Sequence, residues 1–345
     1  TILDPPLAPV ETDPATGVYT ITVAQGDYEI KATSRSHATA IQNVSITGDT
    51  VENFLLAPLP SVLLVDDDKG HTHETYFTQA LGALAEDYTL WDVSWQGEPP
   101  FSELEQYPIV IWNTAADHTD TLSPYAEAEL MDYLDGGGQL FLSSRGYMIE
   151  RGTSDFARDY LHVSSDTKPL VSIETVAGAP GDPVGAWLGP YTLSYPPSFG
   201  DVSTSIHPDI AASAAFIGQF GQPVYSEYVV GATHLDRYAC FRTVHLGVPF
   251  EALPAPDGVV VLRRILGWFR SGCDFGVLTG RVDDVLTGEP LTGAIVSAQG
   301  GRDRFSVMTG ETGVYTMPLL AGTYNLVVAQ DGYVTQAATG VTVTV

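Results

Sequence analysis

Two rhythms of hydrophobic and polar positions divide the chain. Near its beginning, apolar and polar residues alternate at 19–23 and again at 28–32, on either side of a turn that contains Gly26. Such alternation predicts β-strands with one buried face. At about 60–272, apolar residues instead occupy consecutive positions, beginning with Val-Leu-Leu-Val at 62–65. Consecutive apolar residues predict strands that are covered on both faces, as in parallel sheets.

The middle segment alternates between strands and helices. Apolar runs predict strands at 61–66, 88–93, 109–112, 139–143 and 243–247. Helices are predicted at 76–84, from Ser123-Pro124 to the glycines at 136–138, and at 257–270. This alternation with short connections predicts a doubly wound parallel sheet. From about 163 to 235 the sequence becomes rich in Gly, Pro and Ser, which we interpret as an insertion on that sheet.

A repeat links the two ends of the chain. The pentapeptide Thr-Gly-Val-Tyr-Thr occurs at 16–20 and again at 312–316. After a slip of one residue, the match continues from 44–47 to 341–344. Because internal repeats mark repeated structural units, we expect the same small β-module at each end.

The second copy of the repeat carries several turn and strand motifs in order. They are Gly280-Arg281-Val282, Thr287 to Leu291, Gly293-Ala294, Thr312 to Tyr315, Ala321 to Tyr324 and Gly332-Tyr333. With these motifs, residues 277–345 resemble the carboxypeptidase regulatory-like modules, small transthyretin-like β-sandwiches of secreted bacterial proteins, and residues 1–58 resemble them in part. The resemblance implies a β-sandwich at each end, of a kind that mostly serves as a spacer or adhesive unit.

The predicted architecture is therefore a central α/β domain at 60–272, with the insertion at 163–235, between two small all-β sandwich modules. The module at 1–58 lacks a counterpart of the strand and turn at 280–298. The module at 277–345 lacks a counterpart of a last strand that we expect at 51–56. Open strand edges invite pairing with another chain. Either neighbouring domains of a longer chain cover these edges, or copies of the chain join head to tail into a filament.

The charge and composition of the chain limit the kinds of molecule that it can bind. The 345 residues include 42 acidic and 15 basic ones, which gives a net charge of -27, and 44% are hydrophobic. A negative field of this size excludes nucleic acid as a partner, and no apolar run is long enough for insertion into a membrane. The excess of carboxylates suits either cation binding or solubility.

Three segments of the middle domain carry a second resemblance. Residues 62–68, 137–143 and 248–251 resemble the glutamine-amidotransferase-like flavodoxin folds that occur inside large secreted bacterial proteins. The active family places a cysteine nucleophile on the turn after the Gly-Gly-associated strand, and a downstream strand supplies a His and a Glu. Here the turn carries Ser144, and Glu251 has no His beside it. The resemblance therefore implies no catalytic residues, with Ser144 and Glu251 as vestiges of the site.

Three adjacent carboxylates follow the first predicted strand of the middle domain. Asp66, Asp67 and Asp68 stand at its carboxyl end, where open α/β sheets bind their ligands. They either hold a hard cation such as Ca²⁺ through oxygen ligands or serve as capping and turn residues. His71 and His73 lie in the following loop and could join them in a transition-metal site, or they are solvated surface residues. We expect no other cofactor.

Two further pairs of residues are candidates for smaller roles. Cys240 and Cys273 are either disulfide-bonded, as suits an oxidising compartment, or inert buried thiols. Trp187 and Tyr191, within the insertion, are candidates for an exposed platform that binds glycans, although packing is the usual role of such aromatic residues.

These features favour a non-catalytic structural or adhesive segment of a secreted or cell-surface bacterial protein, at an extracellular location. The alternative is an accessory or degenerate hydrolase, or a glycan-binding domain of a secreted peptidase or glycosidase. A histidine within hydrogen-bond reach of Ser144 would favour the alternative.

Overall fold

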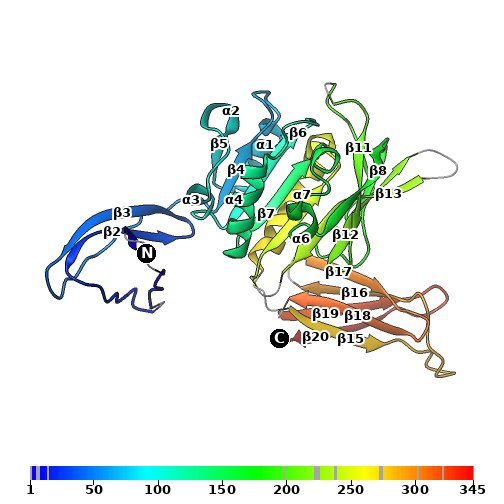
Figure 1. Ribbon diagram of the computed structural model, residues 1–345. Helices are drawn as coiled ribbons and strands as arrows, with labels where there is room; N and C mark the ends of the chain where they lie inside the picture. Colours follow the sequence, from blue (N-terminus) through cyan, green and yellow to red (C-terminus); the bar gives the residue numbers. More distant parts are fainter. Residues whose placement is uncertain are drawn as a thin grey trace.

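The structure is a computed structural model in which three parts of the chain are distinct (Figure 1). It describes residues 2–4, 8–13, 15–197, 199–220, 226–236, 239–271, 275–300, 303–320 and 322–344. A small β-module comes first, a large mixed α/β domain follows it, and a second β-module ends the chain (Figure 1). None of the helices in the described part of the chain has the length and hydropathy needed to span a bilayer.

The central sheet has nine strands in the order β10-β9-β12-β13-β14-β7-β6-β4-β5. Five neighbouring strands are parallel: β5 (Tyr88–Asp92), β4 (Val62–Asp66), β6 (Ile109–Ala115), β7 (Gln139–Ser144) and β14 (Arg242–Leu246). Four antiparallel strands extend them: β13 (Ser226–Leu235), β12 (Ala212–Phe220), β9 (Thr175–Gly178) and β10 (Tyr191–Thr192). The sheet is therefore mixed, and the predicted parallel sheet corresponds only to its five-strand part.

The antiparallel strands correct our interpretation of the insertion. All four lie within residues 163–235, and they continue the central sheet instead of standing apart from it. Two further strands of this segment, β8 (Val163–Val171) and β11 (Ser203–Pro208), pair with each other in a separate antiparallel sheet.

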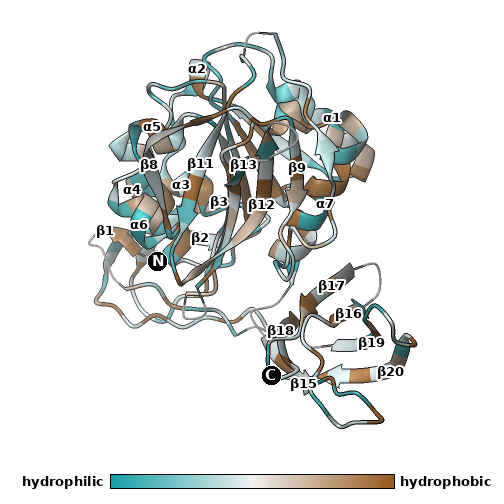
Figure 2. Ribbon diagram, turned by 90° about the vertical axis from the view of Figure 1, so that its right-hand side faces the viewer, coloured by the Kyte–Doolittle hydropathy of each residue, from teal (hydrophilic) through white to brown (hydrophobic). Residues whose placement is uncertain are grey.

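Helices cover both faces of the parallel strands, as Figure 2 shows. On one face lie α1 (Glu74–Leu84) and α7 (Ala255–Arg270). On the other lie α4 (Pro124–Asp135) and the short helices α3 (Phe101–Leu104), α5 (Tyr147–Glu150) and α6 (Asp155–Asp159). Two short elements remain, α2 (Val93–Gln96) and η1 (Phe250–Ala252).

The run of apolar residues in β4 matches the presence of helices on both faces of the sheet. Val62 and Leu64 belong to the core on the side of α1 and α7, whereas Leu63 and Val65 belong to the core on the side of α4. All four side chains are fully buried. Because successive strand residues point to opposite faces, a strand with two covered faces needs apolar residues at every position.

The C-terminal module is a pair of packed sheets. One consists of β15 (Phe275–Arg281) and β18 (Val314–Leu320). The other has the order β17-β16-β19-β20, with β17 (Asp303–Met308), β16 (Ile295–Gly300), β19 (Gly322–Ala329) and β20 (Gln336–Val343). Their inner faces share one hydrophobic cluster, which includes Val296, Met317 and Leu326.

The N-terminal module has a single described sheet, with β1 (Ile2–Asp4), β2 (Gly26–Ser34) and β3 (His37–Ile46). Residues 19–23 show the predicted alternation, since Tyr19, Ile21 and Val23 are half-buried and the residues between them are exposed, but they join no strand ladder. The strand predicted at 51–56 is also absent, and that segment runs as irregular chain in which the Glu52 carbonyl accepts a hydrogen bond from the Tyr19 hydroxyl.

Candidate functional site

The carboxyl ends of β4, β6 and β7 meet at one edge of the central sheet. β4 lies between β5 and β6, so the order of the strands reverses at the β4/β6 boundary. The helix after β4, α1, packs on one face and the helix after β6, α4, packs on the other. The chains leaving the two strands therefore diverge, and they leave a crevice where open α/β sheets bind their ligands.

A group of three carboxylates lies at this edge. Asp66 ends β4, Asp68 follows it by two residues, and Glu74 begins α1. Each offers an oxygen, and these oxygens all lie within 4.8 Å of one another. Asp66 and Asp68 retain only 5% and 1% of their exposure. We call Asp66, Asp68 and Glu74 the acidic triad.

The loop after β4 brings the third carboxylate to the other two. Lys69 and Gly70 have positive φ angles of 60° and 77°, which turn the chain back sharply. The Asp68 carboxylate then accepts a hydrogen bond of 2.8 Å from the backbone N–H of His73, next to Glu74. The imidazole Nδ1 of His73 lies 3.3 Å from the same oxygen, Oδ2 of Asp68.

The acidic triad has buried oxygens that are not satisfied by hydrogen bonds. Oδ1 of Asp66, Oδ1 of Asp68 and Oε2 of Glu74 are buried and have no hydrogen-bond partner. Burial and, to a smaller extent, the neighbouring charges of Asp68 and Glu74 raise the pKa of Asp66 to about 8. Burial also raises the pKa of Glu74. The triad is thus a group of close carboxylates whose ionised forms repel one another.

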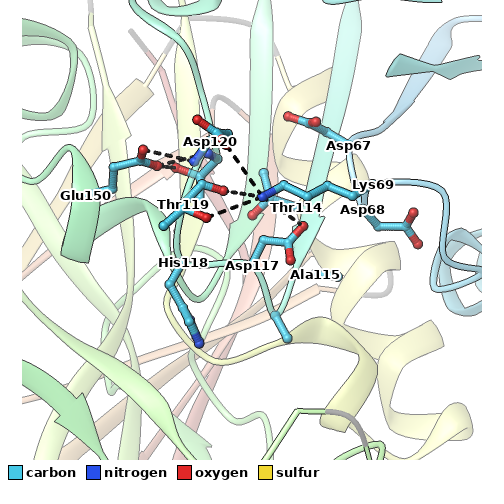
Figure 3. A network of polar contacts seen from close by, with 12 residues as sticks. Asp67, Asp68, Lys69, Thr114, Ala115, Asp117, His118, Thr119, Asp120 and Glu150 are labelled. Atoms are coloured by element: carbon cyan, nitrogen blue, oxygen red, sulfur yellow. Dashed lines mark hydrogen bonds and ion pairs between the residues drawn. The ribbon is translucent and has the colours of Figure 1, made fainter. Parts of the chain in front are cut away.

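Asp67 is separated from the other two residues of the Asp run. Its Oδ2 accepts a hydrogen bond of 3.0 Å from the indole N–H of Trp112. Figure 3 shows the carboxylates of Asp67 and Asp68 pointing away from each other. Burial raises the pKa of Asp67 to about 7, and the bond from Trp112 opposes this shift. The structure therefore places Glu74, and not Asp67, beside Asp66 and Asp68.

The nearby Lys69 is directed to the loop after β6. Its ammonium group donates to the backbone oxygen of Thr119 and lies 3.9 Å from Oδ2 of Asp117 and 4.0 Å from Oδ2 of Asp120 (Figure 3). The carboxylate of Glu150 holds the same loop, because it accepts 2.9 Å bonds from the backbone N–H groups of Asp120 and Thr121.

Glu251 is a fourth buried carboxyl at this edge. It lies in η1, retains 1% of its exposure, and neither of its oxygens has a hydrogen-bond partner. Burial raises the pKa of Glu251 to about 7, Asn113 and Arg145 oppose the shift, and Asp68 adds to it.

The side chain of Ser144 is held by hydrogen bonds inside the protein. Its side chain is completely buried at the end of β7. Its hydroxyl oxygen accepts a 2.6 Å bond from the Thr114 hydroxyl and a 3.0 Å bond from the backbone N–H of Tyr147, at the start of α5. No histidine is among the hydrogen-bond partners of Ser144 in the described part of the chain.

The two histidines of the loop after β4 lie close together, and His73 contacts the acidic triad through Oδ2 of Asp68. The rings of His71 and His73 are 5.4 Å apart, and the His73 ring makes an edge contact with Phe199, 4.7 Å between centroids. The triad is the one group of three or more His, Cys, Asp or Glu residues with metal-ligand spacing among the residues that the structure describes.

The remaining candidates lie away from this edge. Trp187 is 48% exposed and lines a mainly apolar cavity of about 320 Å³ with Ile295 and Met308 of the C-terminal module. Tyr191 is half-buried against the core on the side of α1 and α7. Cys240 takes part in a disulfide bond, whereas Cys273 lies outside the described residues, so the pairing of the two stays a prediction.

Comparison with known proteins identifies one part of the chain. Residues 277–345 match the carboxypeptidase regulatory-like domain family, which confirms that resemblance for this segment. None of the curated proteins compared with the chain matches it.

Solved structures show distant likenesses. A ThuA-like protein from Bacteroides uniformis is 12% identical, with a TM-score of 0.43 over 65% of this chain and 96% of that one. PurLQS from Thermotoga maritima is 12% identical, with a TM-score of 0.41 over 61% and 99%. A glutamine amidotransferase from Methylobacillus flagellatus is 10% identical, with a TM-score of 0.35 over 56% and 70%. Likenesses of this size carry no argument about what the chain does.

Proposed function

We propose that this chain is a non-catalytic structural segment of a secreted or cell-surface protein, in which β-modules flank an amidotransferase-like α/β domain of doubly wound type. The observation that carries the proposal is the environment of Ser144. A serine nucleophile needs access to a substrate and a base that takes its proton. The hydroxyl of Ser144 is completely buried and accepts hydrogen bonds from Thr114 and Tyr147.

Glu251 also suits a vestigial site better than a working one. In an active site of this kind a carboxylate orients a histidine, which in turn activates the nucleophile. Neither oxygen of Glu251 has a hydrogen-bond partner, and its pKa is influenced by Asn113, Asp68 and Arg145. His245, the histidine of the neighbouring strand β14, has its Nδ1 3.3 Å from the carbonyl oxygen of Leu142 instead.

The terminal modules and the disulfide support an extracellular structural role. The carboxypeptidase regulatory-like match covers residues 277–345, and residues 16–20 repeat part of that module near the other end of the chain. A disulfide at Cys240 is what an oxidising compartment permits. In this role the modules would join the α/β domain to its neighbours, either further domains or further copies of the chain.

Hydrolysis assays test the absence of catalysis. We expect neither ammonia release from glutamine nor cleavage of p-nitrophenyl esters above the buffer rate, for the natural chain and for Ser144→Ala alike. Ser144→Cys, which supplies the nucleophile of the active family, should be equally inactive because the position is buried. Turnover that is lost in Ser144→Ala and kept in Ser102→Ala, a substitution at an exposed serine of α3, would contradict the proposal.

Glycan binding is the second candidate, and the half-exposed indole of Trp187 favours it. Sugars need hydrogen-bonding groups as well as an aromatic platform. The cavity beside Trp187 is lined mainly by apolar and small residues, and Tyr191 packs against the core. We therefore rank this function below the structural one.

A further inference from the structure

We propose that Asp66, Asp68 and Glu74 bind a divalent cation, Ca²⁺, which fastens the start of α1 to the end of β4. The proposal goes beyond the structural role above and does not depend on it. It rests on the geometry of the three carboxylates, on the lack of partners for their buried oxygens, and on the direction in which the nearby cationic side chains point.

The spacing of the oxygens fits a shared cation. Ca²⁺ binds oxygen ligands at about 2.3–2.6 Å, so two of its ligands can be at most about 5 Å apart. The ligand oxygens of Asp66, Asp68 and Glu74 all lie within 4.8 Å of one another. One ion can therefore contact all three carboxylates, and water or backbone oxygens would complete its shell.

The unpartnered oxygens give an independent reason. Asp68 retains 1% of its exposure and Asp66 retains 5%, yet Oδ1 of each has no hydrogen-bond partner. Oε2 of Glu74 is also buried without a partner. Buried carboxylates are normally paired, coordinated or protonated, and three of them side by side repel one another when ionised. A cation is the ligand that satisfies all three at once.

The cationic side chains around the triad are engaged with other groups. Lys69 reaches the loop after β6, where it meets Thr119, Asp117 and Asp120. Arg145 donates to the backbone oxygens of Phe199 and Ala116.

The imidazole Nδ1 of His73 lies beside Oδ2 of Asp68, and Oδ1 of that residue is the unpartnered oxygen. The contact of His73 with the triad is therefore at Oδ2 of Asp68, and Oδ1 of that residue is left for another ligand.

The donor set selects the kind of ion. All three ligands are carboxylate oxygens, which hard cations prefer, whereas Zn²⁺ favours histidine and cysteine. Asp66 ends a strand, Asp68 lies in a loop and Glu74 begins a helix, so the three ligands are held by different backbone elements. Ca²⁺ tolerates such irregular sites better than Mg²⁺ does.

Calorimetry and thermal unfolding of the full chain, stripped with EDTA, test the site. We expect Ca²⁺ to bind and to raise the Tm of the α/β domain by about 5–10 °C at a concentration about 100-fold above Kd. Asp68→Asn should raise the Tm in EDTA, because it removes repulsion, and should abolish the increase caused by Ca²⁺. Glu74→Gln, at a partly exposed position, gives a second variant if Asp68→Asn does not fold.

Two control variants sharpen the result. Asp120→Asn changes a carboxylate whose side chain is 91% exposed, and Asp67→Asn changes the member of the Asp run that faces Trp112. Both should keep the Ca²⁺-dependent increase in Tm. The proposal is overturned if neither Ca²⁺, Mg²⁺ nor Mn²⁺ binds, or if the increase persists in both Asp68→Asn and Glu74→Gln. Tighter binding of Zn²⁺ than of Ca²⁺ would contradict the assignment of the ion.

Discussion

His245 is a titratable side chain that the fold holds fully buried on β14. It retains 1% of its exposure, and its Nδ1 lies 3.3 Å from the backbone oxygen of Leu142. Burial lowers the pKa of His245 to about 4, and the contact with Leu142 opposes this shift. The neutral ring is therefore the form that the folded chain accommodates.

This burial predicts a loss of stability in acid. The unfolded chain protonates His245 near its ordinary pKa of 6.5, whereas the folded chain resists protonation until about 4. The free energy of unfolding that depends on His245 is therefore fully present above the unfolded pKa and falls as the pH decreases. At about pH 4.5 the loss amounts to about 2.5 kcal/mol. His245→Gln should lack this component. Urea unfolding of both proteins at neutral and acidic pH measures it, and parallel pH dependences would contradict the prediction.

The Asp run illustrates how much of the candidate site the sequence could predict. Its position at the carboxyl end of a strand followed from the apolar run at 62–65. Alternate residues of an extended chain share a side, so the separation of Asp67 from Asp66 and Asp68 was within reach of the same rule. The place of Glu74 in the triad could not be predicted from the sequence, because it depends on the turn at Lys69 and Gly70. In addition, an acidic residue at the start of a helix is common without any ligand.

At the scale of elements, capping residues and apolar runs in the sequence correctly predicted the helices and strands that depend on neighbouring residues. The helix predicted from Ser123-Pro124 is α4, whose Ser123 hydroxyl accepts from the N–H groups of Tyr125 and Ala126. All five predicted strands of the middle domain are present and parallel to one another. The strands of the insertion were harder to assign, because their place in the sheet depends on pairing such as that of β13 with β14, which short apolar runs do not specify.

The connection between β7 and α5 gives a prediction about packing between elements. A Cβ added to Gly146 would lie 1.7 Å from the backbone oxygen of Asp117, in the loop after β6. The φ angle of Gly146 is -91°, so space and not backbone strain restricts this position. Gly146→Ala should destabilise the α/β domain by about 1–3 kcal/mol, the range for forced overpacking.

Gly82→Ala is the matched control for this substitution. Gly82 lies in α1 at an exposed position, and a Cβ added there meets nothing within 4 Å. Since alanine favours helix more than glycine does, this variant should gain up to about 1 kcal/mol. Denaturant unfolding compares the two, and equal stability of Gly146→Ala and the natural chain would show that the loop after β6 moves freely.

At the scale of the whole molecule, the two terminal modules have equivalent strand pairs, but the first has fewer described strands than the second. Ile2 pairs with Ile30 in the first, and Ala298 pairs with Leu326 in the second, at the same offset of 296 residues as the repeated pentapeptide. By this offset, residues 18–24 correspond to β18, which pairs along its length with β15. Residues 18–24 pair with no strand among the described residues. The Val18 carbonyl accepts a hydrogen bond from Asp13 and the Ala24 carbonyl accepts one from the Tyr28 hydroxyl, so the open part of the edge lies between these two residues.

An open edge in one module and an edge strand in the other lead to our last prediction. β20 is the terminal strand of its sheet, and its residues 336–340 are exposed. We expect β20 of one copy to pair with residues 18–24 of the next, which gives an open series of copies and not a closed dimer, because the two surfaces differ. Sedimentation velocity should then show a mass that keeps rising with protein concentration. Thr20→Pro removes a backbone donor from the open edge and should abolish the association, whereas Thr20→Ala should preserve it. If the natural chain sediments as a monomer at every concentration, copies of this chain do not join through their β-modules.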